Sequence, residues 1–403
     1  MENIYDKYKD SGIAWIGEIP EHWEVIPHKR IMRKKKIIKE LYAGENILSL
    51  TKKGVIIRDL EAGGKMPTTF NGYQVLYPDN LLMCLFDIDV TPRCVGIIKD
   101  EGLSSPAYSQ FVLNQLGYTP FFDYLLRYMD DEKCLLHLSK NLRNSLTEDD
   151  FGQIETILPS TQEQQSIATY LDQKCGEIDE LITLQEEMIT KLQSYKQSVI
   201  TEAVTKGLDK NVPLKDSGIE WIGEIPEHWK ITKIQYLAQL KSGYNLTTEE
   251  IKDSGLYPVY GGNGIRGYYD KYFLEGDYVL IGRQGALCGN INYSTGKSWA
   301  TEHAVVCYPK TKYITKWFGE LLRVMNLNQY SLAAAQPGLA VERIKLLPIP
   351  IIPLSEQQSI ANYLDQKCSE IDELISIKQQ KIEKLKDYKK SLIFECVTGK
   401  RKV

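Results

Sequence analysis

The chain repeats one stretch of twenty residues almost unchanged, and this repeat limits what the chain can fold into. Residues 163–182 read EQQSIATYLDQKCGEIDELI, and residues 356–375 read EQQSIANYLDQKCSEIDELI, so that 18 of 20 positions agree. A second marker is also duplicated, as SGIAWIGEIPEHW at 11–23 and SGIEWIGEIPEHW at 217–229. Two copies of one long frame in 403 residues predict two homologous halves rather than a solenoid of many short repeats.

The shorter marker has the composition of a structural clasp. Its Gly-Glu-Ile-Pro segment contains residue types that are typical of turns, and each copy carries two tryptophans that are suited to packing. We therefore interpret Trp15, Trp23, Trp221 and Trp229 as anchors that hold each half together, and not as a binding site.

The longer marker opens a helical pattern in each half. Apolar residues recur at heptad spacing from about residue 161 to 204, and they recur again 193 positions later. Two such lines in one chain most simply pack on each other as an antiparallel pair that relates the halves by a pseudo-twofold axis. The residues we expect in helix packing or partner contacts are Leu171, Ile178, Leu181, Met188, Leu192, Tyr195, Leu364, Ile371, Leu374, Leu385 and Tyr388.

Between the markers lie two blocks that differ in detail. The first, about residues 24–157, alternates short apolar runs with Gly, Pro and Asn, and it contains a helical stretch near 120–129. The second, about residues 230–353, is rich in Tyr and Gly. The predicted fold class is α+β, with α/β domains at 1–160 and 208–354 joined by long helices at 161–207 and 355–403.

Composition narrows the classes of function. No apolar run is long enough for a membrane span, and the charged N-terminus predicts no signal peptide. Eight scattered cysteines with no CxxC pair predict free thiols in a reducing, cytoplasmic setting. The net charge of −4 argues against a free-standing, electrostatically driven nucleic-acid binder, although local basic faces remain compatible with it.

No catalytic or metal-binding motif emerges from the sequence. Gly262, Gly264 and Gly267 spell GxGxxG, but GYYDKYF follows where a dinucleotide site needs a helix. Gly296-Lys297-Ser298 resembles the end of a phosphate-binding loop, but the required earlier glycine is Ile291. The cofactor turn and the catalytic motif of adenine methyltransferases are also missing.

What remains is recognition chemistry. Residues 28–39 hold seven Lys or Arg in twelve positions, either a solvated face or a contact to DNA phosphates. Arginine can bridge two acceptors of guanine, and Asn or Gln can pair with adenine. For each candidate a solvated loop position is the simpler alternative. The candidate DNA-binding residues are Lys29, Arg30, Lys34, Lys35, Arg93, Arg143, Asn263, Arg266, Arg283, Gln284 and Gln336.

The combined pattern resembles a known family. IGEIPEHW, a variable block ending in LPSTQEQQSIATYLD, a long helix and the repetition of this arrangement are similar to the specificity subunits of type I restriction–modification systems. YGGNGIRGYYDKY, IGRQGALCG and AAAQPGL in the second block resemble target-recognition domains of that family. The resemblance covers nearly the entire chain.

The resemblance implies a non-catalytic subunit. Each variable block would be a target-recognition domain reading one half of a split, asymmetric site in double-stranded DNA, and the helices would set the spacing. Two methylation subunits would dock on the helices, and two restriction subunits would join for cleavage. S-adenosylmethionine, ATP and Mg²⁺ are then expected on the partner subunits, and this chain would bind no cofactor or metal.

Three alternatives differ in class. A self-sufficient DNA enzyme is disfavoured by the missing motifs. A coiled-coil scaffold with two binding domains is compatible with the duplicated frame, and only the resemblance disfavours it. The third is the specificity subunit of a fused methylase–nuclease (type IIB-like) system, which differs from the type I assignment only in its partners.

Overall fold

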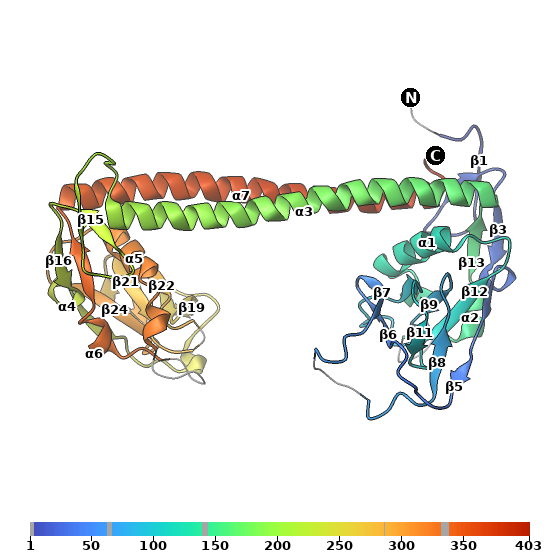
Figure 1. Cartoon of the computed structure of the whole chain (residues 1–403), viewed down its shortest axis with the longest axis horizontal. Coiled ribbons are helices and arrows are strands. Elements are labelled where there is room, and N and C mark those ends of the chain that lie inside the picture. Colours follow the sequence, from blue (N-terminus) through green and yellow to red (C-terminus); the bar gives the residue numbers. More distant parts are fainter. Residues whose placement is uncertain (1–3, 63–66, 139–143, 286, 332–337) are drawn as a thin grey trace. The chain divides into compact units, whose positions relative to one another are not determined.

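The structure is a computed structural model that describes residues 4–62, 67–138, 144–285, 287–331 and 338–403. The chain forms two compact units, one of residues 1–185 and 380–403 and the other of residues 186–379. Each unit contains one mixed α/β domain and half of each long helix (Figure 1). Among the described residues, no helix combines the length and apolar character needed to cross a membrane.

The strands and helices of the first unit follow the pattern of short apolar runs and turn residues that the sequence predicts. Its elements are β1 (Tyr8–Asp10), β2 (Glu18–Pro20), β3 (Glu24–Pro27), η1 (His28–Arg30), β4 (Met32–Lys34), β5 (Ile38–Lys39), β6 (Leu48–Thr51), β7 (Gly54–Ile57), β8 (Tyr73–Leu76), β9 (Leu81–Met83), β10 (Val95–Ile97), β11 (Gly102–Ser104), β12 (Ser109–Leu113), α1 (Thr119–Asp131), η2 (Leu136–Leu138), α2 (Glu148–Gln153) and β13 (Glu155–Leu158).

The second unit repeats this order with two exceptions. It has no counterpart of β5 among its described residues, and it adds the turn η3. Its elements are β14 (Leu214–Asp216), β15 (Glu224–Pro226), β16 (Lys230–Lys233), α4 (Ile234–Leu237), β17 (Ala238–Ser242), η3 (Thr248–Glu250), β18 (Tyr257–Gly261), β19 (Gly264–Tyr269), β20 (Leu274–Glu275), β21 (Tyr278–Gly282), β22 (Ile291–Ser294), β23 (Lys297–Ala300), β24 (Ala304–Pro309), α5 (Thr315–Val324), η4 (Leu327–Tyr330), α6 (Val341–Ile344) and β25 (Pro348–Ile351).

The two domains share one strand topology. A four-stranded antiparallel sheet has the order β10-β9-β12-β4 in the first unit and β22-β21-β24-β17 in the second. The pairs β8–β11 and β20–β23 are both antiparallel and form part of a second layer. A parallel bridge joins Ile47, directly before β6, to Leu103 of β11, and β18 pairs with β23 in parallel. Each strand of one domain, β5 excepted, therefore has a counterpart in the other.

The long helices begin directly at the domains. β13 pairs with β3 and leads into α3 (Thr161–Lys206), while β25 pairs with β16 and leads into α7 (Leu354–Val397). In each unit the helices run antiparallel. Asp179 pairs with Lys389 in the first unit, and Asp372 pairs with Lys196 in the second. This arrangement confirms the predicted fold class.

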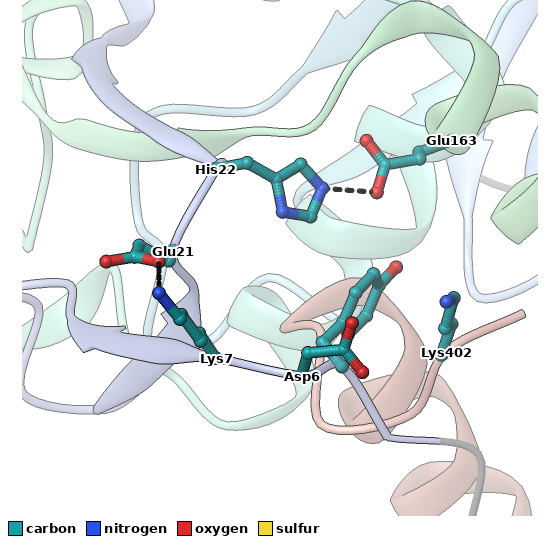
Figure 2. A pocket seen from close by; sticks show the side chains of 7 residues that line it. Asp6, Lys7, Glu21, His22, Glu163 and Lys402 are labelled. Atoms are coloured by element: carbon teal, nitrogen blue, oxygen red, sulfur yellow. Dashed lines mark hydrogen bonds and ion pairs between the residues drawn. The ribbon is translucent and has the colours of Figure 1, made fainter.

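The repeated IGEIPEHW segment clasps the start of one long helix and the end of the other. In the first unit Glu163 Oε1 accepts a hydrogen bond from His22 Nε2 at 2.8 Å (Figure 2). The same oxygen accepts from Trp23 Nε1 at 3.2 Å. In the second unit Glu356 accepts the same bonds from His228 (2.7 Å) and Trp229 (2.9 Å). Both tryptophans are fully buried. The equal contacts explain why the marker and the helix start are both repeated.

Glu163 also caps its own helix. Its carboxylate accepts from the Ser160 backbone and hydroxyl while Ser160 Oγ accepts from the Glu163 N–H, which is the geometry of a capping box. Burial alone would raise the pKa of this carboxyl, but the bonds from His22, Ser160 and Trp23 outweigh burial and lower it.

Glycines end both helices at the clasps. Gly207 follows α3 with φ +75°, and Gly399 follows α7 with φ +74°. A Cβ on Gly399 would lie 2.4 Å from Pro20 Cδ, and one on Gly207 would lie 3.2 Å from the Trp229 ring. Both the left-handed backbone and the close approach require glycine at these two positions.

Candidate nucleic-acid interface

In the second unit, three loops meet at one end of the two sheet layers. They connect β18 to β19 (262–263), β21 to β22 (described at 283–285 and 287–290) and β23 to β24 (301–303), and we call them the three-loop cluster. The loops approach so closely that a Cβ on Gly282 would lie 2.2 Å from the Gly262 carbonyl oxygen. The Arg283 N–H donates to the His303 carbonyl at 2.8 Å. Glycine at these positions is therefore a packing requirement and not a dinucleotide motif.

Four of the predicted DNA-binding residues lie in or beside this cluster. Asn263 Oδ1 accepts from Asn290 Nδ2 at 2.7 Å, and Arg283 Nη1 donates to Ser242 Oγ at 3.1 Å. Arg266 is exposed, and its side chain crosses Gly261. Gln284 is exposed, and its Oε1 lies 3.0 Å from His303 Nδ1. The cluster thus brings amide, guanidinium and imidazole groups onto one part of the second unit.

Sequence reasoning missed three members of the cluster. Asn290 holds Asn263, and His303 lies between Gln284 and Glu302, whose Oε1 is 3.1 Å from His303 Nε2. The available signal was the polar Thr-Glu-His turn inside an otherwise apolar strand pattern, WATEHAVVCYP, at 299–309. Such an interruption is typical of a loop between two buried strands.

The counterpart loops of the first unit carry different chemistry. The turn between β6 and β7 holds exposed Lys52 and Lys53, in place of Gly262 and Asn263. The loop between β9 and β10 meets the loop between β11 and β12 through stacked rings of Phe86 and Tyr108, whose centroids are 5.9 Å apart. Aromatic packing takes the place of the amide and imidazole contacts of the second unit.

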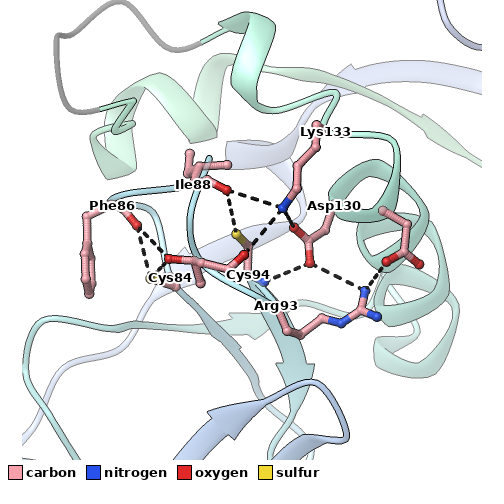
Figure 3. A network of polar contacts seen from close by, with 9 residues as sticks. Cys84, Phe86, Ile88, Arg93, Cys94, Asp130 and Lys133 are labelled. Carbon is pink, nitrogen blue, oxygen red and sulfur yellow. Dashed lines mark hydrogen bonds and ion pairs between the residues drawn. The ribbon is translucent and has the colours of Figure 1, made fainter. Parts of the chain in front are cut away.

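Arg93 is held inside the first unit. Its Nη1 lies 2.8 Å from Asp131 and 3.4 Å from Asp130, at the end of α1 (Figure 3). Asp130 also accepts from the Cys94 backbone N–H at 2.8 Å, and Lys133 donates to carbonyls of the same loop. These contacts brace the loop 84–94. Base reading by Arg93 stays a prediction, and it would require the guanidinium to leave these carboxylates.

The basic run of the first unit lies on η1 and on the edge strand β4. Lys29 donates to Gln153 at 2.8 Å, Lys34 pairs with Glu148 at 2.5 Å, and Lys35 lies 3.4 Å from the centroid of the Tyr77 ring. The Arg30 side chain is exposed. The internal partners reduce the charge that this run offers to phosphates. Its role as a DNA contact stays a prediction, as do those of Arg143 and Gln336, which lie outside the described residues.

The residues predicted to pack lie along two lines at heptad spacing on each long helix, and the structure buries only one of these lines. Leu171, Ile178, Leu364 and Ile371 are buried, and Leu192 and Leu385 are partly buried. The second line of the contact is Cys175, Ile182, Ile189, Lys196 and Ala203 in α3, and its counterparts in α7. The residues expected on that line, Leu181, Met188, Tyr195, Leu374 and Tyr388, are instead exposed.

The reason for this difference lies in neighbouring apolar residues. Leu181 precedes Ile182, Met188 precedes Ile189, and Leu374 precedes Ile375, so heptad spacing fits either line. A helix pair that touches along one line can bury only one residue of each such pair. The structure partly buries the isoleucines, and it leaves an exposed apolar stripe on each unit. The stripe residues are Leu181, Leu184 and Tyr388 in the first unit, and Met188, Tyr195, Leu374 and Ile377 in the second, all between 43% and 56% exposed.

The described residues show no candidate metal centre and no exposed cysteine. No group of three or more His, Cys, Asp or Glu side chains among them could hold a metal ion. All eight cysteines are free and at least partly buried, and burial raises the pKa of the Cys94 and Cys307 thiols far above the ordinary value.

Comparisons with known proteins agree with this architecture. The family model for the type I restriction modification DNA specificity domain matches residues 226–387. The type I restriction enzyme EcoprrI specificity subunit of Escherichia coli is 40% identical over 134 residues, which are 32% of this chain and 33% of that protein. The chain thus matches about a third of that relative's length.

Two longer matches cover nearly the whole chain. The putative type I restriction enzyme MjaX specificity subunit of Methanocaldococcus jannaschii is 24% identical over 438 aligned positions, covering 96% of both proteins. A chain in a solved structure on complex assembly and conformational transition of the type I R-M system has a TM-score of 0.73 and 14% identity, covering 94% of this chain and 98% of that one. At this identity the structural match concerns the fold alone.

The duplicated α/β domains, each with antiparallel segments of two long helices, have the fold of the specificity-subunit class. Residues 226–387 thus match a type I restriction modification DNA specificity domain, and the chain as a whole is similar to specificity subunits of type I systems.

Proposed function

We propose that this chain reads a split, asymmetric site in double-stranded DNA, with one half-site for each α/β domain. The observation that carries the proposal is the contrast between frame and loops. The two domains share their strand pairings and their clasps, but the counterpart loops are held by different contacts, amide and imidazole groups in the second domain and stacked aromatic rings in the first. Two domains with different reading groups recognise two different sequences, so the site would not be a palindrome.

The helix pair sets the spacing between half-sites in this proposal. α3 has 46 residues and α7 has 44, and both pass through the two units. One DNA turn is roughly 34 Å, and the two half-sites would lie about one turn apart with unread positions between them. An insertion of one heptad in a single helix would break the register between the contact residues of the two helices. A matched insertion in both helices would lengthen the distance between the two half-sites.

The exposed apolar stripes are the proposed docking sites for two methylation subunits. Each unit carries one stripe in equivalent positions, as two identical partners require. An exposed apolar stripe on a helix pair fits an amphipathic helix of a partner, which would complete a helical bundle. Two restriction subunits would join this assembly for cleavage, in the cytoplasm where the DNA lies. The target adenines would be flipped out into the methylation subunits, which would bind S-adenosylmethionine, while ATP and Mg²⁺ belong to the restriction step.

The net charge of −4 also fits a subunit that does not hold DNA alone. Non-specific affinity for DNA comes mainly from Lys and Arg at the phosphates, and here Lys29 and Lys34 are engaged internally. The partners would supply much of the positive surface. We expect the isolated chain to bind DNA weakly at physiological salt, and tight binding by the isolated chain would contradict this part of the proposal.

The test is to co-express the chain with the methylation subunit from its own genomic neighbourhood and to map modified bases by single-molecule sequencing. The expected result is a split motif with N6-methyladenine in each half. Exchange of residues 230–353 for the block of a related subunit should change one half only. Methylation of a continuous palindrome would overturn the two-reader model. A stable complex without methylation would favour a scaffold.

A further inference from the structure

We infer that the second domain reads a guanine through the side-chain amide of Gln284, and that His303 is the positioning residue that orients this amide. The inference rests on the proposed function and adds to it the class of base and the residues concerned. It starts from the hydrogen-bonding capacity that the three-loop cluster leaves for a ligand.

The side-chain amide oxygens of Gln284 and Asn263 both have partners within the cluster. Gln284 Oε1 lies 3.0 Å from His303 Nδ1, and because an amide oxygen can only accept, this contact needs the proton on Nδ1. Asn263 Oδ1 accepts from Asn290 Nδ2 at 2.7 Å. The two amide oxygens that could have accepted hydrogen bonds from a base are therefore engaged by described neighbours.

The remaining capacity is mostly that of donors. With Oε1 held by His303, Gln284 presents its amide NH₂, and Asn263 does the same beside it. Arg283 keeps guanidinium donors beyond the one that contacts Ser242, and Arg266 adds further donors. In the major groove, guanine presents two acceptors, N7 and O6, on one edge. Adenine needs both an acceptor and a donor from glutamine, and here the acceptor of Gln284 is engaged.

The backbone fixes these groups before any ligand arrives. The Gly282 Cα lies against the Gly262 carbonyl, and His303 is tied to the same point because its carbonyl accepts from the Arg283 N–H at 2.8 Å. The amide of Gln284 is thus held from two sides, by its own backbone and by the imidazole. A hydrogen-bond donor that is already held in place loses less conformational entropy when it binds DNA than a mobile donor does. This favours discrimination between bases.

The first experiment uses the complex of the full chain with its methylation subunit and DNA that carries the mapped site. Replacement of one guanine of the second half-site by 7-deazaguanine removes N7 and should weaken binding roughly 5- to 150-fold at the contacted position. The same replacement should have little effect on the Gln284→Ala complex. Equal weakening of both complexes at every guanine would overturn the inference.

A change of preference is the sharper result. Gln284→Glu replaces donors by acceptors, so this variant should prefer cytosine, whose N4 donates, at the same position. The methylated motif should change at that one base, while the half read by the first domain stays the same. Gln239→Glu makes the same charge change at an exposed position of β17 and should leave the motif unaltered. An unaltered motif for Gln284→Glu would contradict the assignment.

His303 is tested by loss and rescue. His303→Ala should relax discrimination at the base assigned to Gln284 and at no other position. His303→Asn places an amide Nδ2 where the imidazole has Nδ1, so it should restore the discrimination. Relaxed preference across the whole half-site, or no rescue by asparagine, would show a general structural role and overturn the positioning role. A wild-type complex without any specific DNA binding would instead overturn the proposed function itself.

Discussion

The two α/β domains have the same strand pairings and the same clasp, but they meet the long helices and their surroundings through different side chains. In the first unit, Tyr124 OH donates to Asp172 at 2.8 Å, and in the second unit Lys316 lies 3.3 Å from the counterpart residue, Asp365. The carboxylate is repeated, and its partner is not. The shared strands and helices thus accept different contact residues from the two variable blocks, while the clasp contacts stay the same. This separation is what allows one fold to carry two reading surfaces.

The largest expected effect comes from the clasps. Trp23→Ala and Trp229→Ala each remove a fully buried indole and its bond to the glutamate in the first turn of a long helix, and each should lower the free energy of unfolding by about 3–5 kcal/mol. The two losses should be similar because both rings are fully buried and both donate to that glutamate. Urea denaturation measures the loss, and amide hydrogen exchange shows which unit is weakened. A loss in only one unit would mean that the clasps are not equivalent.

A buried histidine distinguishes the units at low pH. His28 is fully buried on Phe151, with ring centroids 4.5 Å apart, and the second unit has buried Ile234 in its place. Burial, only partly offset by the bond to the Phe151 carbonyl, lowers the pKa of His28 from 6.5 to about 4. The unfolded chain therefore binds the proton first. Stability is unaffected above about pH 6.5, and it falls by up to about 3 kcal/mol as the pH drops toward 4.

Two substitutions isolate this contribution from the other titrating groups. His28→Ile should remove the acid sensitivity of the first unit, and Ile234→His should introduce it in the second. Urea midpoints at pH 7 and at pH 4.5 measure both effects. An acid dependence of His28→Ile that equals that of the wild type would show that His28 is not its source.

Substitutions in the two exposed apolar stripes, the proposed docking sites, should have effects of intermediate size. Leu181→Asp and Leu374→Asp each place a charge in one of the two stripes. Each should weaken the binding of one methylation subunit by about 2 kcal/mol or more, which is roughly 30-fold in affinity. Native mass spectrometry should then count one bound subunit instead of two. Leu214→Asp, at an exposed position of β14, is the control. Loss of both subunits from either variant would contradict two independent sites.

The stripes also differ at one position, which sharpens the comparison. Met188 of the second unit has Lys381 as its counterpart in the first. Because methionine buries more apolar surface without desolvating a charge, the second unit should bind its partner more tightly. Lys381→Met should bring the two affinities together, and unchanged affinities would place this position outside the contact.

Much of the frame could be predicted from the sequence, since repeated motifs mark repeated contacts. The heptad pattern predicts both long helices, and the run of short apolar segments predicts the strands. The contact line of the helix pair could not be chosen, because Leu181 and Ile182 satisfy the same spacing. Only the packing of the partner helix decides between them.

The candidate site was less accessible to sequence reasoning. Gln284 and Asn263 stood out because they follow apolar strands beside glycines, but their partners His303 and Asn290 lie 19 and 27 residues away. Such contacts depend on strand order, which one sequence does not specify. The same limit applies to Arg93, whose carboxylate partners come from the far end of α1.

The smallest expected effect concerns the two ion pairs that join the helices. Lys389–Asp179 and Lys196–Asp372 both have distances of 2.7 Å, and their aspartates are 59% and 58% exposed. Water screens such pairs, so Asp179→Asn and Asp372→Asn should each lower the free energy of unfolding by less than about 1 kcal/mol. The two losses should be equal and should shrink as salt is raised, as urea denaturation at two salt concentrations can show. If one variant lost far more than the other, its pair would belong to a larger network, and the helix pair would not be symmetric at its charged flanks.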